Sequence, residues 1–231
     1  MAATLLSRYS LYENDELTRY VNRVGRSVAL CSDRPEIYGG WHFAVLDADE
    51  VNAFAAPGGM IFITRGMVTM LPDEEALACV LAHEVGHVSS RHGLAAIKKS
   101  RLMDAFALIG REAGTAWDQK DLVKLTDVFD GAVGDVVRTL VEQGYSRSQE
   151  KEADRLGVKY ASAVGYRADG ITRFLERMAA AGSGGGGMFS THPPAKDRIR
   201  DVEPEVVSHL AEGTDPSARK ERFEKSTRSA G

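Results

Sequence analysis

Three residues of this sequence, His83, Glu84 and His87, have types and a spacing that suit metal chemistry. The surrounding segment, 73–88, has the pattern of a helix, and histidines four residues apart on a helix lie on one face, roughly 6 Å apart at Cβ. Both imidazoles can then reach one Zn²⁺ at about 2.0–2.1 Å. Glu84 lies beside that ion, where its carboxylate can take a proton from a metal-bound water. The spacing predicts a hydrolytic zinc site with Glu84 as its general base.

The helix that must carry these residues has acidic side chains, Glu74 and Glu75, in its first turn, as the helix dipole prefers. Its apolar residues recur at helical spacing, and we expect the helix to run over residues 73–98. On one continuous helix, His92 lies roughly 140° further round the axis than His87. We therefore predict that His92 faces away from the metal, on the surface or on a second face.

Cys79 precedes His83 by one turn and is an alternative metal ligand. On a straight helix, however, Cys79 and His87 are about 12 Å apart along the axis, so the three side chains cannot converge on one ion. We expect Cys79 to be a small buried residue of the core.

A zinc ion held by two histidines needs a third protein ligand, with one position left for water. The segment 145–158 has the pattern of a second helix and offers Glu150 and Glu152. These two differ by about 200° around the axis, so only one can face the metal. We choose Glu150 because it shares a face with Asp154, which can accept a hydrogen bond from the far nitrogen of a ligating histidine. The alternative is a solvated charged face.

Short β-forming stretches precede the histidine helix and predict a small antiparallel sheet beside it. They cover residues 42–47, 51–55 and 60–64. An open sheet edge next to a metal can hold an extended peptide by strand addition, and the alternative is plain scaffold. Further helices are expected at 14–30, 102–111, 122–143 and 168–181 and from 197 onward. The apolar residues of the helices at 102–111 and 122–143 are interpreted as core rather than as a cofactor site.

His192 follows a glycine-rich run, 182–187, and precedes Pro193 and Pro194. The run predicts a mobile loop, which can bring His192 over the metal. There the imidazole can donate to an oxyanion or take the fourth zinc position. Arg198 is the other candidate donor. The alternative is an ordinary linker with a surface histidine.

The length of 231 residues fits one domain, which we place at 1–212, followed by a polar and loosely held tail at 213–231. The net charge of −4 gives no reason to expect a nucleic-acid partner. Because no stretch approaches 18 apolar residues, we expect no transmembrane span. The first residues lack the apolar core of a signal peptide. We expect a periplasmic or envelope-associated location if a targeting segment has been removed, and a cytoplasmic one otherwise.

The combined motifs resemble the M48 family of zinc metallopeptidases. The resemblance rests on His83-Glu84-Val85-Gly86-His87, followed about sixty residues later by Ser146-Arg147 and Glu150-x-Glu152-Ala153-Asp154. Further similar segments are Asn52–Gly59, Thr64–Gly66, and Ser190–Pro194 with Arg198 beyond it. The resemblance covers about residues 15–205. Lacking membrane-spanning helices, the chain is most similar to the soluble members of the family.

This resemblance implies an α+β, mostly α, zincin-like fold with one zinc ion per chain on His83, His87 and Glu150. Glu84 would be the catalytic base, and Asp154 would support a ligand from behind. The resemblance also implies a substrate-aligning edge strand formed by Asn52, Ala53, Phe54, Ala55 and Ala56.

The sequence thus predicts a zinc endopeptidase that acts on unfolded or extended protein substrates, in protein quality control of the cell envelope. One alternative is a zinc hydrolase of another class, such as a deformylase or an aminopeptidase. Another is a zinc-latched binding or chaperone module. Glu84 argues against that last alternative, because a binding module has no use for a general base beside its metal.

Overall fold

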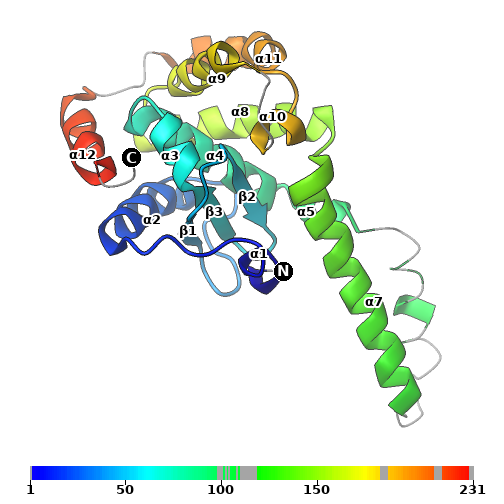
Figure 1. The fold of residues 1–231 in the computed structure, drawn as a ribbon. Coiled ribbons are helices and arrows are strands. Elements are labelled where there is room, and N and C mark those ends of the chain that lie inside the picture. Colours follow the sequence, from blue (N-terminus) through cyan, green and yellow to red (C-terminus); the bar gives the residue numbers. More distant parts are fainter. Residues whose placement is uncertain are drawn as a thin grey trace.

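The computed structural model describes residues 2–97, 119–182, 187–210 and 215–228, together with part of 101–109. Helices surround a small three-stranded sheet, and one long helix, α7, extends away from the body (Figure 1). Within the predicted helical segment 102–111, the described residues 103, 105–107 and 109 are helical. Met103, Phe106 and Ile109 are exposed, so for them the interpretation as core is wrong. The centre of the predicted mobile loop, 183–186, lies outside the described residues.

The catalytic candidates lie on α4 (Glu74–Ser89), which is buried along nearly its whole length. Asp73 caps this helix, because its side chain accepts a hydrogen bond from the backbone N–H of Ala76 at 3.0 Å. Helices α2 (Asp15–Leu30), α8 (Arg147–Val164) and α9 (Gly170–Ala181) pack around α4. Cys79 is buried in this core, as the sequence predicts. Its thiol is free.

Two glycines let α4 and α8 approach each other closely. A Cβ on Gly86 of α4 would lie 3.3 Å from Cα of Ala153, and a Cβ on Gly157 of α8 would lie 3.1 Å from the backbone N of His83. Such distances are shorter than ordinary van der Waals contact, so larger residues would push the helices apart. The first half of α8 therefore lies directly against the histidines of α4.

The sheet is mixed, and the prediction of a wholly antiparallel sheet is wrong. Its order is β1-β3-β2, formed by β1 (His42–Leu46), β2 (Ala53–Ala56) and β3 (Met60–Thr64). The β2–β3 pair is an antiparallel hairpin, closed by a turn in which Gly58 and Gly59 both have positive φ. Because the chain enters this hairpin at the far edge, β3 returns alongside β1 in the parallel direction. This leaves β2 at an edge of the sheet.

The remaining elements complete the body around this centre. Residues Ala2–Leu6 form α1, Arg65–Met70 form α3, His92–Ala95 form α5, Met188–Thr191 form α10 and Ala195–His209 form α11. The predicted helix at 14–30 is confirmed as α2, and Asn14 is its cap.

Residues of the expected loose tail instead form a packed helix, α12 (Ser217–Thr227). Phe223 is buried, and Arg222 and Arg219 pair with the buried carboxylates of Glu74 and Glu75 at the start of α4. Buried carboxylates need such partners, so the expectation of a loosely held segment is wrong here. This helix packs because its arginines meet carboxylates that are distant in the sequence, and not because the tail has an apolar pattern of its own.

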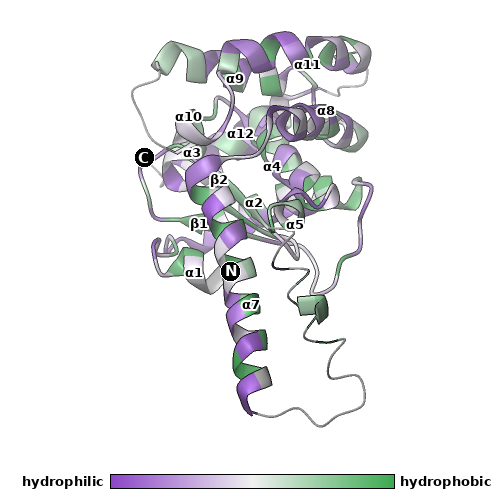
Figure 2. Cartoon of the chain, turned by 90° about the vertical axis from the view of Figure 1, so that its right-hand side faces the viewer, coloured by the Kyte–Doolittle hydropathy of each residue, from purple (hydrophilic) through white to green (hydrophobic). Residues whose placement is uncertain are grey.

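The predicted helix at 122–143 is present as α7 (Gln119–Arg138) and the short π-helix η1 (Thr139–Gln143). Only its end contributes to a core, through Val136 and Val137. Leu122 and Phe129 are 53% and 66% exposed, so for them the interpretation as core is wrong. Figure 2 shows apolar and polar residues alternating along this projecting helix. Among the described residues, no helix has the length and apolar character needed to cross a membrane.

Candidate metal centre

Four side chains meet between α4, α8 and the segment after α10. His83, His87, Glu150 and His192 each offer one ligand atom, and these atoms all lie within 4.8 Å of one another. The Nε2 atoms of His83 and His87 are 3.0 Å apart. The carboxylate oxygens of Glu150 lie 3.6 Å from Nε2 of His83 and 3.5 Å from Nε2 of His87. Nε2 of His192 is 3.6 Å from Glu150 Oε2.

Glu150 reaches this cluster because of where α8 begins. Ser146 caps the helix, and its side chain and that of Gln149 form a capping box. Glu150 then lies in the first turn, with its side chain only 1% exposed. Glu152 points elsewhere: its side chain is 47% exposed and accepts a hydrogen bond from Ser90 at 3.0 Å. Of the two glutamates weighed from the sequence, the structure thus brings Glu150 to the histidines.

Behind His83 lies a buried chain of polar contacts. Nδ1 of His83 donates to Asp154 Oδ1 at 2.8 Å, so Nε2 is left to face the cluster. Arg198 in turn donates to Asp154 from Nε at 3.0 Å and from Nη2 at 2.6 Å. Arg198 therefore lies on the Nδ1 side of His83, and its hydrogen bonds hold the carboxylate that orients this imidazole.

His92 contacts the cluster from behind His87, and the prediction that it faces away is wrong. The continuous helix expected at 73–98 is interrupted at Arg91, which has a left-handed φ of 59°. The chain turns there, and His92 is buried with its Nδ1 2.9 Å from Nδ1 of His87. Nε2 of His92 lies 3.4 Å from Glu152. His92 thus contacts Nδ1 of His87, just as Asp154 contacts Nδ1 of His83.

Tyr145 is a second residue of the site to which the sequence assigns no role. Its ring stacks on the imidazole of His87, with centroids 4.1 Å apart and an interplanar angle of 18°. Its buried hydroxyl has no hydrogen-bond partner in the structure. A tyrosine at the start of a predicted helix carries no signal of this contact, because the contact depends on how η1 leads the chain into α8.

Burial dominates the electrostatics of the cluster. It lowers the pKa of His83, His87 and His192 below the ordinary value, which keeps these imidazoles neutral. It raises the pKa of Glu150 well above the ordinary value, and that of Glu84 to about 8.

Asp154 behaves in the opposite way. Burial alone would raise its pKa, but Arg198 and His83 hold the pKa of Asp154 below the ordinary value. A carboxylate that stays charged is thus fixed behind His83.

The donor set fits a divalent metal ion. Among the residues that the structure describes, both buried carboxylate oxygens of Glu150 have no hydrogen-bond partner, and neither does Oε1 of Glu84. Buried polar atoms without partners are rare and costly, so they call for a ligand. Imidazole nitrogens together with one carboxylate are a typical zinc donor set.

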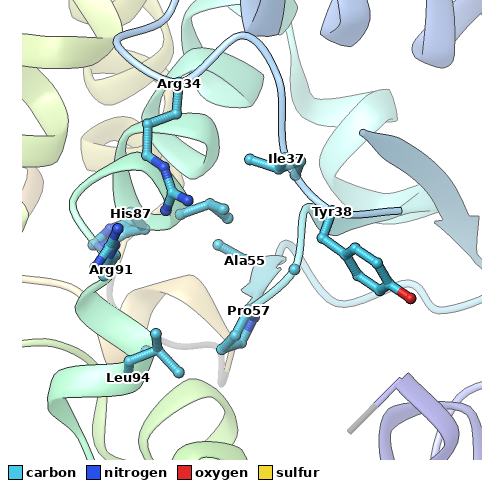
Figure 3. A pocket seen from close by; sticks show the side chains of 11 residues that line it. Arg34, Ile37, Tyr38, Ala55, Pro57, His87, Arg91 and Leu94 are labelled. Atoms are coloured by element: carbon cyan, nitrogen blue, oxygen red, sulfur yellow. The ribbon is translucent and has the colours of Figure 1, made fainter. Parts of the chain in front are cut away.

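The predicted edge strand lies beside this centre. Ala55 of β2 and His87 line one pocket of about 260 Å³ (Figure 3). Asn52 precedes β2: its backbone oxygen accepts from Thr64 at 3.0 Å, and its side chain accepts from the N–H of Ala53 at 2.9 Å. Because bonding directions alternate along a strand, the polar backbone groups of Ala53 and Ala55 point to the outer edge.

The other two residues of the predicted edge strand serve a different purpose. Phe54 and Ala56 pack into a small separate core with Leu5, Leu46 and Phe62. Their side chains therefore face away from the main core, to which Ala53 and Ala55 belong.

Comparison with known proteins supports the chemistry suggested by this geometry. Residues 15–206 match peptidase family M48. The chain is 27% identical to the beta-barrel assembly-enhancing protease of Escherichia coli (strain K12), over 80% of this chain and 38% of that protein. It is 31% identical to the mitochondrial metalloendopeptidase OMA1 of Schizosaccharomyces pombe, over 80% of this chain and 52% of that protein. It is 30% identical to the metalloprotease YcaL of Escherichia coli (strain K12), over 72% of this chain and 63% of that protein.

The chain thus spans less than two thirds of the length of each of these relatives. The match nevertheless covers both helices that build the metal centre and the sheet beside them. The chain therefore belongs to peptidase family M48.

Proposed function

We propose that this protein is a zinc-dependent endopeptidase that cuts unfolded or extended protein segments, with one zinc ion per chain. His83, His87 and Glu150 would hold the ion. The observation that carries the proposal is the buried carboxylate of Glu150, which has no hydrogen-bond partner and faces imidazole nitrogens at 3.5–3.6 Å. A bound Zn²⁺ would supply a Lewis acid and lower the pKa of water.

Glu84 would act as the general base. It is buried next to a proposed ligand, and one of its oxygens has no partner. Its carboxylate would take the proton of the attacking water and later deliver it to the leaving amine. Burial raises its pKa, which favours holding the proton until the amine leaves.

The other residues of the site would fix geometry. Asp154, held by Arg198, orients His83, and His92 orients His87. These contacts give Arg198 a positioning role, since its two hydrogen bonds with carboxylate oxygens lie behind the ring rather than in front of it.

We further propose that an extended substrate segment lies along the outer edge of β2, at residues 52–56. Two observations support this placement: β2 is the edge strand, and Ala55 shares a pocket with His87. Main-chain hydrogen bonds to this edge would bind the substrate regardless of much of its sequence, as suits a protease for unfolded proteins.

We propose that His192 is a latch. The sequence leaves two destinations for it, and its place within the four-atom donor set favours the fourth metal position over that of an oxyanion donor. Such an arrangement would displace the water and hold the enzyme inactive. This observation also gives the best support for the alternative function, a zinc-latched binding or chaperone module with little proteolytic activity.

The location of the protein is part of the proposal. One relative's name refers to beta-barrel assembly, which supports protein quality control in the bacterial envelope. We propose a periplasmic or envelope-associated location on that basis.

The proposed function can be tested by metal analysis together with cleavage of casein. Purified protein should contain about one zinc ion per chain, and a chelator should abolish cleavage, which added zinc restores. A fully zinc-loaded protein that binds casein without cutting it, even after the latch is removed by His192→Ala, would favour the binding module instead.

A further inference from the structure

The pocket beside the metal centre has a charged side and an apolar side. His87 and Ala55, both buried, are among the residues that line it. Arg34 and Arg91 lie together on one side, next to His87, whereas Ile37, Pro57 and Leu94 line the rest (Figure 3). An occupant that fits this lining needs an apolar body and a negative charge.

Neither arginine of the pocket has an ion-pair partner among the described residues. By contrast, Arg198 is paired with Asp154 and Arg219 with Glu75. The positive charge at the pocket is therefore not neutralised by an ion pair within the described part of the chain. A pair of uncompensated guanidinium groups favours a carboxylate, which each can bind through parallel hydrogen bonds.

The backbone positions both arginines firmly although their side chains are free. The N–H of Arg34 donates to Ser32 Oγ at 3.2 Å, and its carbonyl accepts from Trp41 at 3.3 Å. Arg91 has the left-handed φ of 59°, and it is the one non-glycine residue with positive φ among those that the structure describes. This conformation is disfavoured for an L-residue and tends to persist at functional sites. Here it places a guanidinium at the pocket instead of continuing the helix.

The apolar side of the pocket is also left open. Leu94 is 49% exposed, and Tyr38, at the rim, is fully exposed at 102%. An exposed aromatic ring at the rim of an apolar pocket marks a place where a partner adds contact area.

We propose that this pocket selects substrates that carry a large apolar side chain close to a carboxylate, with Arg34 and Arg91 binding the carboxylate. The inference rests on the proposed function and adds a sequence preference to it. The carboxylate comes either from an Asp or Glu side chain or from the free C-terminus of the substrate. The preference is electrostatic, so it weakens as salt increases.

The test uses internally quenched peptides with one phenylalanine and one cleavable bond. Glutamate, glutamine or lysine is placed in turn at each position on both sides of that bond. At one position near phenylalanine, glutamate should raise kcat/KM about tenfold over glutamine, as two charge-assisted contacts of ordinary strength would give. Matched peptides that end at this position, as a free carboxylate or as an amide, separate the C-terminal source from the side-chain source.

Variants then assign the preference to the two arginines. The double substitution Arg34→Gln and Arg91→Gln should remove the preference, so that the ratio of kcat/KM for the glutamate peptide to that for the glutamine peptide falls to about one. Glutamate in place of both arginines should reverse the preference, so that the peptide with lysine is cut best. Lysine in place of both arginines should retain the preference for the glutamate peptide. Arg26→Gln is the matched control, because Arg26 is exposed on α2 and is not one of the residues that line this pocket.

Binding gives a second readout that does not depend on turnover. Fluorescence anisotropy of labelled peptides with the zinc-loaded Glu84→Gln variant should show the same order of affinities. Equal cleavage and equal binding of all the peptides would overturn the pocket proposal while leaving the peptidase intact. Absence of any cleavage in the chelator-sensitive casein assay would instead contradict the proposed function itself.

Discussion

His87 and His92 face each other through their Nδ1 atoms, 2.9 Å apart. Only one of the two nitrogens carries the shared hydrogen. If His87 donates it, Nε2 of His87 is free for a cation, and His92 can donate from its own Nε2 to Glu152, 3.4 Å away. This pairing makes His92 an orienting partner of a proposed zinc ligand.

We expect His92→Ala to weaken zinc binding about 10–100-fold, the usual effect of losing an outer partner of a ligand. His92→Asn should restore much of the affinity, because its amide oxygen can accept the same hydrogen. Competition with a chromophoric chelator measures the affinity, and the visible spectrum of the cobalt-substituted protein reports the geometry at His87. An alanine variant with wild-type affinity and an unchanged cobalt spectrum would return His92 to a purely structural role.

Glu84→Gln should retain zinc and lose peptidase activity by about 10²–10⁴-fold. The amide has nearly the shape of the carboxylate but cannot take the proton of water. Metal content and casein cleavage are measured on the same sample. Near wild-type turnover by a zinc-replete variant would contradict the role of Glu84 as general base.

Glu150→Ala should lower zinc affinity more than Glu152→Ala does. The side chain of Glu150 is 1% exposed and faces the histidines, whereas Glu152 acts only through His92. For Glu152→Ala we expect zinc affinity to fall by at most about tenfold, which is the low end of the effect of losing a residue that hydrogen-bonds to a metal ligand. If the order of the two affinities is reversed, the assignment of the third ligand is wrong.

His192→Ala should raise basal activity with zinc retained, because the fourth metal position is freed for water. The same substitution would lower turnover about 10²–10³-fold if His192 donated to the oxyanion instead. The two roles thus differ in sign. Activity within about twofold of wild type on an unfolded protein would exclude both.

Gly157→Ala should destabilise the protein by about 1–3 kcal/mol and weaken zinc binding. Its Cβ would lie 3.1 Å from the backbone N of His83, so α8 must shift and carry Glu150 with it. Gly134→Ala is the control: nothing lies within 4 Å of a Cβ there, and the gain in helix propensity should stabilise by about 0.5–1 kcal/mol. Thermal melting and zinc titration of both variants check the prediction.

Much of the fold was predictable because apolar residues at helical spacing mark helices, although the same pattern on α7 did not report burial. The pattern of α4 and α8 brought His83, His87 and Glu150 within reach of one another, and the β-forming run after Asn52 placed an edge strand nearby. Periodicity carries no information about a left-handed arginine, so the turn at Arg91 and the inward position of His92 were missed.

Other features depend on contacts between distant segments. The parallel pairing of β1 with β3 follows from the edge at which the hairpin enters the sheet, which no local pattern specifies. Helix α12 forms on the buried carboxylates of Glu74 and Glu75, more than a hundred residues earlier in the chain. The sequence of α12 itself has one large buried apolar residue, Phe223.

The pairing of α12 with α4 also sets an order for biosynthesis. Glu74 and Glu75 leave the ribosome long before Arg219 and Arg222, and until those arginines emerge the two carboxylates lack their cationic partners. The N-terminal end of the catalytic helix therefore completes its packing only when translation has passed residue 222. His83, Glu84 and His87 are therefore synthesised before the charge pairs that complete the first turn of their helix can form.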